Sequence, residues 1–320
     1  MTTNDEFSKI RWLTERLGPR RPQDDAVEVR LGIGDDAAVV DFGGRPTVVT
    51  VDTHVEGVHF RRSMMSSAAL GARAFLAATS DVWAMGATPS AAVVALTLPD
   101  DHDDSAFRAL VEGLDEAAHA CGAPIIGGNL SGASILSITT TVFGTCANRI
   151  VSRAGAEVGD VVYVTGTLGA AALGFAALEA GAVSPDTETF IARWRRPPSH
   201  AAIVESLRTG ATAAIDVSDG LLQDLDHLCH ASNVGATVRG NALPRAPGYD
   251  ETCRRLGLDP LNLALTGGED YEVLFCAPAG AAVPKDVTDI GRITEGPGIV
   301  VLNDLGKPVD VTETGFRHFS

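Results

Sequence analysis

Lysine is scarce in this chain of 320 residues, and its positions exclude one common way of binding a nucleotide. The lysines are Lys9, Lys285 and Lys307, and none of them belongs to a G-x-x-x-x-G-K-[ST] segment. In that segment, backbone amides and a lysine together hold the phosphates. Any nucleotide bound by this chain must therefore be held by other groups.

Cysteine is also infrequent, and its spacing argues against a thiolate metal site. The five cysteines form no C-x-x-C pair and are widely scattered, at Cys121, Cys146, Cys229, Cys253 and Cys276. An odd number of scattered cysteines indicates reduced, buried thiols. The N-terminal segment lacks a basic region followed by an apolar stretch, and the apolar runs are too short to cross a bilayer. The sequence therefore predicts a soluble, cytoplasmic protein.

Positive charge is scarce relative to negative charge. The formal net charge is −16, and a surface of that sign would repel a nucleic-acid backbone or an anionic membrane. Two explanations for the acids stay open: a solvated surface that aids solubility, and carboxylates gathered to hold cations that bind phosphates. With 45% hydrophobic and 5% aromatic residues, the composition is that of a folded α/β enzyme long enough for two domains.

Two parts of the chain carry separate patterns of strands and helices. In the first part, β-branched runs predict strands over 47–51 and 136–144, and apolar residues at helical spacing predict helices over 68–85 and 107–121. The first strand is expected to end at Asp52. A second unit begins near Gly159, with a buried-type strand over 161–165. We therefore place two α/β domains, at residues 1–148 and 149–320.

Two segments of the second unit are less informative. Gly166-Thr-Leu-Gly169 joins the predicted strand to an Ala-rich helix, and such a turn can bring a helix N-terminus close to a phosphate. Turns of this kind are mostly structural, however, so the signal is weak. Residues 193–198, RWRRPP, indicate the end of a helix and are assigned no chemistry.

The distinctive feature of the sequence is a set of acids at chain reversals beside glycine or other small residues. The segments are GIGDDAAVV (32–40), TVDTHVEGVHF (50–60), ATSDVWAMGA (78–87), IDVSDG (215–220) and LTGGEDYEVLF (265–275). Carboxylates at strand ends suit Mg²⁺, which prefers oxygen ligands and shares them with substrate phosphates. Each segment is weak alone. Together they predict a magnesium site that also binds phosphates.

Each acid also has a purely structural interpretation. Asp35 and Asp36 can form an Asx turn, and Asp219 can cap the helix that follows it. Asp81 lies within a predicted apolar helix, where an unpaired carboxylate is costly, so a bound cation or a helix break is favoured there. His59 ends a strand-like segment and either contacts a ligand phosphate or forms a hydrogen bond at a surface turn.

Taken in order, these segments resemble the thiamine-monophosphate kinases. These belong to a superfamily with aminoimidazole ribonucleotide synthetase, selenophosphate synthetase and a hydrogenase-maturation dehydratase. The resemblance runs nearly end to end, and its later motifs are SRAGAEVGD, VYVTGTLG, IDVSDGL, GGEDYE and a terminal GFRHF. It implies an α/β (α+β) fold with an ATP- and magnesium-binding N-terminal domain over 1–148, which forms a β-barrel shared across a homodimer. A C-terminal α/β domain over 149–320 would close the cleft.

The resemblance also implies roles for individual residues. Magnesium ligands would be Asp36, Thr50, Asp52, Asp81, Asp216 and Asp219, with Asp81 and Asp219 catalytic. ATP would contact Gly127, Gly128, Asn129, Arg153 and Ser218. The thiamine monophosphate pocket would be lined by His59, Glu269 and Phe316. Whether K⁺ assists is left open.

The chain departs from the family pattern at a few of these positions. Asn129 stands where the usual GGDTT motif has a metal-binding aspartate, Val51 replaces a threonine, and Phe316 stands where an aromatic hydroxyl is common. The implied reaction is transfer of the γ-phosphoryl group of ATP to thiamine monophosphate, which relies on positioning and charge neutralisation. Two alternatives stay open: a catalytically silent dimer that binds nucleotide or thiamine phosphates, and a same-fold ATP-dependent enzyme with another acceptor.

Overall fold

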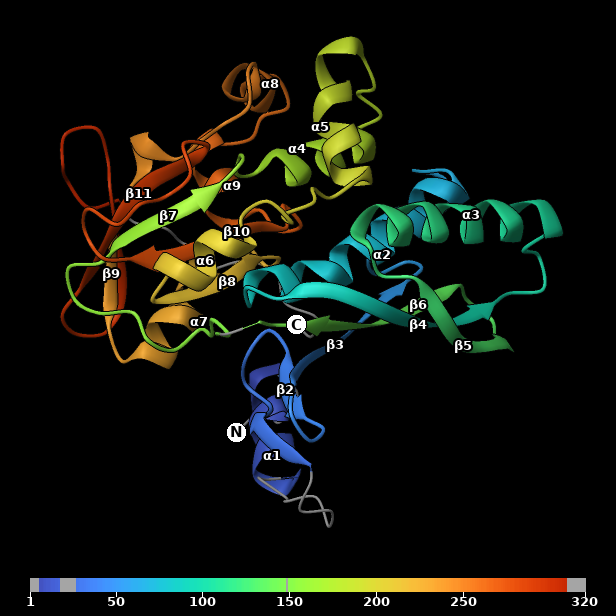
Figure 1. The fold of residues 1–320 in the computed structure, drawn as a ribbon. Helices are drawn as coiled ribbons and strands as arrows, with labels where there is room; N and C mark the ends of the chain where they lie inside the picture. The colour runs from blue at the N-terminus through green and yellow to red at the C-terminus, as the bar shows by residue number, and fades with distance from the viewer. Residues whose placement is uncertain (1–5, 18–26, 148, 310–320) are drawn as a thin grey trace.

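The computed structural model describes residues 6–17, 27–147 and 149–309 of the chain. Figure 1 shows two α/β units joined side by side, with helix α2 running between their sheets. Helix α1 (Glu6–Leu17) lies apart from both units, beside β2. Among the described residues, no helix combines the length and the apolar character needed to cross a bilayer.

The first sheet contains strands from residues 28–145, in the order β1-β2-β3-β6-β4-β5. Its strands are β1 (Glu28–Leu31), β2 (Ala38–Asp41), β3 (Pro46–Val55), β4 (Thr88–Leu98), β5 (Ile125–Gly132) and β6 (Ser137–Thr145). Only the β4–β5 pair among these is parallel. Helices α2 (Ser67–Ala84) and α3 (Asp104–Cys121) cover one face (Figure 1). Both helices lie within a residue or a turn of their predicted ranges.

Strand β3 is longer than predicted, and this changes the setting of Asp52. The strand was expected to end at that residue, but it pairs with β6 from Thr47 to Val55. Thr50 and His54 on one face of β3 are buried, whereas Val51 on the other face is 63% exposed. The polar residues therefore continue the period-two alternation of a strand and do not mark a turn. Asp52 lies inside the strand.

The second sheet contains strands from residues 161–302, in the order β12-β9-β11-β7-β10-β8. Its strands are β7 (Val161–Thr165), β8 (Ala213–Val217), β9 (Gly235–Arg239), β10 (Glu272–Ala277), β11 (Val287–Thr294) and β12 (Gly298–Leu302). The surrounding helices are α4 (Ala170–Glu179), α5 (Pro185–Arg195), α6 (Val204–Gly210), α7 (Leu221–Ser232), α8 (Tyr249–Arg255) and α9 (Pro260–Thr266), with a 3₁₀ turn at Gly240–Ala242. The sheets thus divide the chain as the two predicted domains do, although the boundary itself stays a prediction.

Helix α2 joins the two halves because it is buried on nearly every side. It begins at the N-cap Ser66, whose hydroxyl accepts a hydrogen bond from the Ala69 amide. Its apolar residues, including Phe75 and Trp83, are almost fully buried. Besides packing on α3 and the first sheet, α2 contacts β8, β10, α5 and α6 of the second unit. A helix that is apolar all round is expected in such a position.

The α2–α3 crossing depends on two glycines. A Cβ atom on Gly113 would lie 1.9 Å from the carbonyl oxygen of Ala68, and one on Gly71 would lie 2.2 Å from that of Leu110. The two backbones therefore approach more closely than any side chain allows. Predicted helix α3 ends, as expected, at Gly122, which has a left-handed conformation (φ 70°).

Replacing Gly113 by alanine is expected to destabilise the protein by about 1–3 kcal/mol, because the added methyl group clashes with backbone. Helix propensity alone would predict a gain of about 1 kcal/mol. Chemical denaturation measures the free energy of unfolding of the variant and of the native protein. Gly210→Ala at the end of α6 is the control, since its methyl group would meet nothing closer than 3.7 Å. Equal stability of the two variants would contradict the close crossing.

Candidate active site

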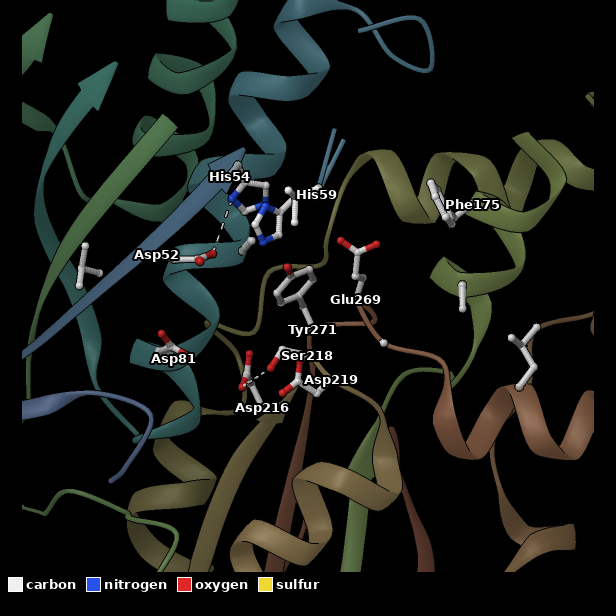
Figure 2. Close-up of a pocket in the computed structure, with 16 residues that line it drawn as sticks. Asp52, His54, His59, Asp81, Phe175, Asp216, Ser218, Asp219, Glu269 and Tyr271 are labelled. Carbon is white, nitrogen blue, oxygen red and sulfur yellow. Dashed lines mark hydrogen bonds and ion pairs between the residues drawn. The ribbon is translucent and has the colours of Figure 1, made fainter. Parts of the chain in front are cut away.

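A cavity of about 500 Å³ lies between the two halves of the molecule. β3 and α2 of the first half and α4, β8 and the loop before β10 of the second half supply its walls (Figure 2). The acids Asp52, Asp81, Asp216 and Asp219 line it, and so do the apolar residues Val58, Ala172, Phe175 and Leu263. Phe175 on α4 lies on the opposite side from Asp81 and Asp216 (Figure 2). The other residues of the lining are Val51, His54, His59, Ala77, Ser218, Gly268, Glu269 and Tyr271.

Three carboxylates from distant segments meet beside the acidic side of the cavity. Asp36 comes from the loop between β1 and β2, Asp81 from the interior of α2, and Asp216 from β8. One oxygen atom of each lies within 4.8 Å of the others. The structure thus brings together three of the predicted ligands, and Asp52 and Asp219 line the same cavity.

Neighbouring side chains fix the orientation of each carboxylate. Thr50 donates a hydrogen bond to Oδ2 of Asp81 (2.5 Å), and Ser80 donates one to Oδ2 of Asp216 (2.8 Å). Arg153 donates from Nε to Oδ1 of Asp36 at 2.7 Å. The Asp36 side chain is fully buried, and its Oδ2 has no hydrogen-bond partner among the described residues. A buried acceptor of this kind is costly unless a donor or a cation satisfies it.

Burial and mutual repulsion raise the pKa values of the cluster. Burial, opposed by Arg153 and reinforced by Asp216, raises the pKa of Asp36 to about 8. Burial likewise raises the pKa of Asp216 to about 6 and holds that of Asp81 well above its usual range. A divalent cation among these oxygen atoms would reverse the shifts. An all-oxygen, acidic ligand set fits Mg²⁺.

The structural interpretations of the acids have different outcomes. Asp35 accepts a hydrogen bond at Oδ1 from the amide of the next residue, Asp36 (3.0 Å), whereas an Asx turn would use the amide two residues on. Asp36 itself joins the cluster. The capping interpretation of Asp219 is wrong. Helix α7 has Gly220 as its N-cap, and Oδ2 of Asp224 accepts from the amides of Asp219 (3.1 Å) and Gly220 (3.0 Å). The cap is therefore supplied from within the first turn of the helix.

The glycine turn before α4 has a structural role. Asp270 accepts hydrogen bonds from the amides of Gly169 (2.5 Å) and Ala171 (3.0 Å) at the N-terminus of α4. A Cβ atom on Gly166 would lie 1.9 Å from a carboxylate oxygen of Glu272. Carboxylates of the protein thus take the place that a phosphate would occupy at this helix.

Two of the three residues predicted for the acceptor pocket line the cavity. His59 accepts a hydrogen bond at Nδ1 from the Val55 amide (3.0 Å), and Glu269 stands on the loop before β10. Phe316 lies outside the described residues. Sequence reasoning missed His54, Phe175 and Tyr271, which also line the cavity (Figure 2).

The residues predicted to contact ATP fall into two groups. Arg153 and Ser218 lie at the acidic cluster, where Ser218 donates to Asp216 at 3.5 Å. Gly127, Gly128 and Asn129 lie on β5 at the edge of the first sheet and do not line the cavity. Gly128 is required there for a local reason, since a Cβ atom would lie 1.8 Å from the carbonyl oxygen of Val94 on parallel β4. Their contact with ATP stays a prediction.

Comparisons with known proteins agree with this geometry. The family model for AIR synthase related protein, N-terminal domain, matches residues 34–146, and the model for its C-terminal domain matches 157–303. The thiamine-monophosphate kinase of Aquifex aeolicus is 36% identical over 290 residues, which cover 90% of this chain and 92% of that protein. The Escherichia coli K12 enzyme of the same name is 34% identical, with 98% of each chain covered.

The chain belongs to the thiamine-monophosphate kinase family. This confirms the resemblance and the two-domain α/β fold. The solved structure of AaThiL complexed with AMPPCP and TMP is 33% identical to the chain and superposes with a TM-score of 0.88, covering 98% of this chain and 97% of the other. The kinase from Stenotrophomonas maltophilia K279a is 33% identical with a TM-score of 0.76, covering 94% and 96%. The chain has asparagine at position 129, and its cluster still contains three carboxylates, with Asp36 and Asp216 buried and Asp81 half-buried.

Proposed function

We propose that this protein transfers the γ-phosphoryl group of ATP to thiamine monophosphate, giving thiamine diphosphate and ADP. The observation that carries the proposal is the cavity itself, which joins a cluster of buried and half-buried carboxylates to a largely apolar wall. Such a cavity suits two ligands that meet through their phosphates. The Aquifex aeolicus relative, whose match covers 90% of this chain, is named for this reaction. A similar protein of known structure binds an ATP analogue and TMP together.

The residues of the acidic cluster fit Mg²⁺. Asp36, Asp81 and Asp216 would hold it, with Asp52, Asp219 and Thr50 as further oxygen donors. When bound, the ion neutralises phosphate charge in the transferring group. The chain's own part is to keep the carboxylates oriented, which Thr50 and Ser80 do through the hydrogen bonds described above. Arg153 and Ser218, beside the cluster, would contact the nucleotide phosphates.

Transfer to a phosphate acceptor makes modest demands on acid–base groups. The acceptor oxygen is already ionised at neutral pH, so the site has to align it and not deprotonate it. Burial lowers the pKa of His54 to about 4, so this histidine is neutral at the cavity wall. We therefore assign Asp81 and Asp219 a catalytic role through orientation and charge. Proton transfer is not part of that role.

The apolar side of the cavity would take the rings of the acceptor. Phe175, Leu263 and Val58 offer apolar contact. Tyr271 lies between Phe175 and the carboxylates of Asp81 and Asp216 (Figure 2). The thiazolium ring of thiamine carries a positive charge, which the carboxylates of Asp52 and Glu269 would balance. This division of the cavity explains how one end can select the acceptor while the other binds phosphates.

A cytoplasmic homodimer with a shared β-barrel is part of the same proposal. The face of the first sheet opposite α2 and α3 carries Val51, which is 63% exposed, and the half-buried apolar residues Val49, Val93 and Phe143. Apolar residues clustered on one sheet face are typical of a surface that another sheet covers. A second copy of this chain would bury them.

Incubating the purified protein with ATP, Mg²⁺ and thiamine monophosphate is expected to yield thiamine diphosphate and ADP in equal amounts. Chromatography of the products measures both. Unphosphorylated thiamine is the matched control acceptor and should give no product. Product formed only by Asn129→Asp would support a silent native protein, whereas ADP released only with other acceptors would support a different substrate. Either result would overturn the proposal.

A further inference from the structure

Arg73 is a fully buried cation that joins the two halves of the molecule behind the cavity. It lies on α2 with 0% of its surface exposed. One arm of its guanidinium donates to the carbonyl oxygen of Trp194 on α5, and the other arm donates to Oε1 of Glu269. A buried charge is stable only with such partners, so the position of Arg73 is fixed by the second half of the protein.

Trp194 completes the arrangement from the other side. Its indole Nε1 donates to Oε2 of Glu269 at 2.8 Å, and the Arg73 guanidinium carbon lies 4.9 Å from the centre of its ring. The ring also packs against Phe175 on the cavity wall, with centroids 5.3 Å apart. Both carboxylate oxygens of Glu269 are therefore engaged, one by Arg73 and one by Trp194.

The loop that carries Glu269 needs such support. Glu269 (φ 70°) and Tyr271 (φ 49°) both have a left-handed backbone, which is unfavourable for residues other than glycine. Their amides donate to the carbonyl oxygens of Ser218 (2.7 Å) and Val217 (2.8 Å), at the end of β8. Conformations of this kind persist only when surrounding contacts enforce them, and they gather at ligand sites.

We propose that Arg73 and Trp194 are positioning residues that fix Glu269 and Phe175, and so set the affinity of the cavity for the acceptor. The inference rests on the proposed function, since it assigns this wall to thiamine monophosphate. Neither residue lines the cavity, so both act through Glu269, Phe175 and the strained loop. Of the carboxylates that would bind the nucleotide's cation, Asp36 and Asp216 lie on other elements, and Asp81 lies about two turns further along α2. The hydrogen bonds of Arg73 and Trp194 described above go to none of them, so ATP affinity should not depend on the pair.

The rival explanation is that Arg73 merely joins the two halves. Arg208 on α6 provides a matched control, because it also crosses between them, donating from Nε to the carbonyl oxygen of Gly86 at 2.6 Å. It has no contact with the loop of Glu269 among those described. If joining the halves is all that matters, Arg208→Met should affect the enzyme as Arg73→Met does.

The test compares Trp194→Phe, Arg73→Met and Arg208→Met with the native full-length chain. Trp194→Phe keeps an aromatic ring at this position and removes the hydrogen bond to Glu269, at the cost of some buried volume. It is a milder change than the loss of the Arg73 charge, so it remains informative if Arg73→Met fails to fold. We expect KM for thiamine monophosphate to rise about tenfold in Trp194→Phe and about tenfold to a hundredfold in Arg73→Met. KM for ATP and kcat should stay within about twofold, and calorimetry should show the same loss of acceptor binding.

Several outcomes would overturn the proposal. They are an unchanged acceptor KM in Trp194→Phe, equal rises in KM for both substrates, or the same acceptor-specific loss in Arg208→Met. A native protein that neither binds nor phosphorylates thiamine monophosphate would refute the proposed function, and this inference with it. That failure is distinct, because it is seen before any variant is made.

Discussion

Asp216→Asn is expected to lower kcat/KM for thiamine monophosphate phosphorylation by about a hundredfold to a thousandfold while leaving the protein folded. Asp216 is buried in β8, beside Asp36 and Asp81, and asparagine keeps its shape and can still accept from Ser80. The substitution removes a full negative charge from the ligand set. Steady-state kinetics at saturating Mg²⁺ measure the loss.

The same substitution is expected to make the metal-free protein more stable at neutral pH. Ionising Asp216 in the folded state costs free energy, because burial raises its pKa to about 6 from the value of about 3.9 that is usual for an aspartate. That shift corresponds to a penalty on the order of 3 kcal/mol above pH 6, which asparagine does not incur. Asp115→Asn on the exposed face of α3 is the matched control. It should change neither kcat/KM nor the stability of the metal-free protein. Activity close to native in Asp216→Asn would remove the cluster from the mechanism.

Mg²⁺ is expected to stabilise the protein far more at pH 8 than at pH 5. A carboxyl group whose folded pKa is raised binds more protons folded than unfolded, so its contribution is greatest below the unfolded pKa and is lost as pH rises through the folded value. This loss of stability begins near pH 4 for both residues. It is complete near pH 6 for Asp216 and near pH 8 for Asp36. The metal-free protein should therefore lose stability across this pH range.

Thermal unfolding with EDTA and with millimolar MgCl₂ measures this effect. We expect Mg²⁺ to raise Tm by about 5 °C or more at pH 8, where the carboxylates are ionised, and by little at pH 5. Asp270, whose pKa burial raises to about 7, also titrates in this range, but it caps α4 and should not respond to Mg²⁺. Asp216→Asn should show a smaller Mg²⁺ effect at pH 8. An equal Tm shift at both pH values would contradict a carboxylate site.

Motifs identified the acidic side of the cavity better than local patterns could. The sequence grouped Asp36, Asp81 and Asp216 through segments that resemble a family, and the structure brings their oxygen atoms together. Asp81 was the most informative of them, because a carboxylate inside an apolar helix needs a partner. Local patterns also predicted α2 and α3, where the helical period is long and clear.

Contacts between distant segments account for what was missed. Asp270 caps α4 across a separation of about 100 residues, and nothing near either segment signals it. In the sequence, nothing distinguishes Arg73 from other helix residues. Its role depends on its contact with Glu269, which is 196 positions away in the chain. Trp194 belongs to the segment RWRRPP, which shows only the end of a helix. Side-chain partners of this kind depend on how the two halves of the protein pack together. The periodicity of hydrophobic residues predicts helices and strands but not their packing.

Consecutive residues of α2 connect the two sheets at the cluster. Ser80 holds Asp216 on β8, while Asp81 is held by Thr50 on β3. A rotation of one half against the other that breaks the Ser80–Asp216 hydrogen bond must also draw Asp216 away from Asp81. Opening of the cleft in this way would separate two of the three carboxylates that fit a cation, so the contact that closes the cleft also keeps the cluster together.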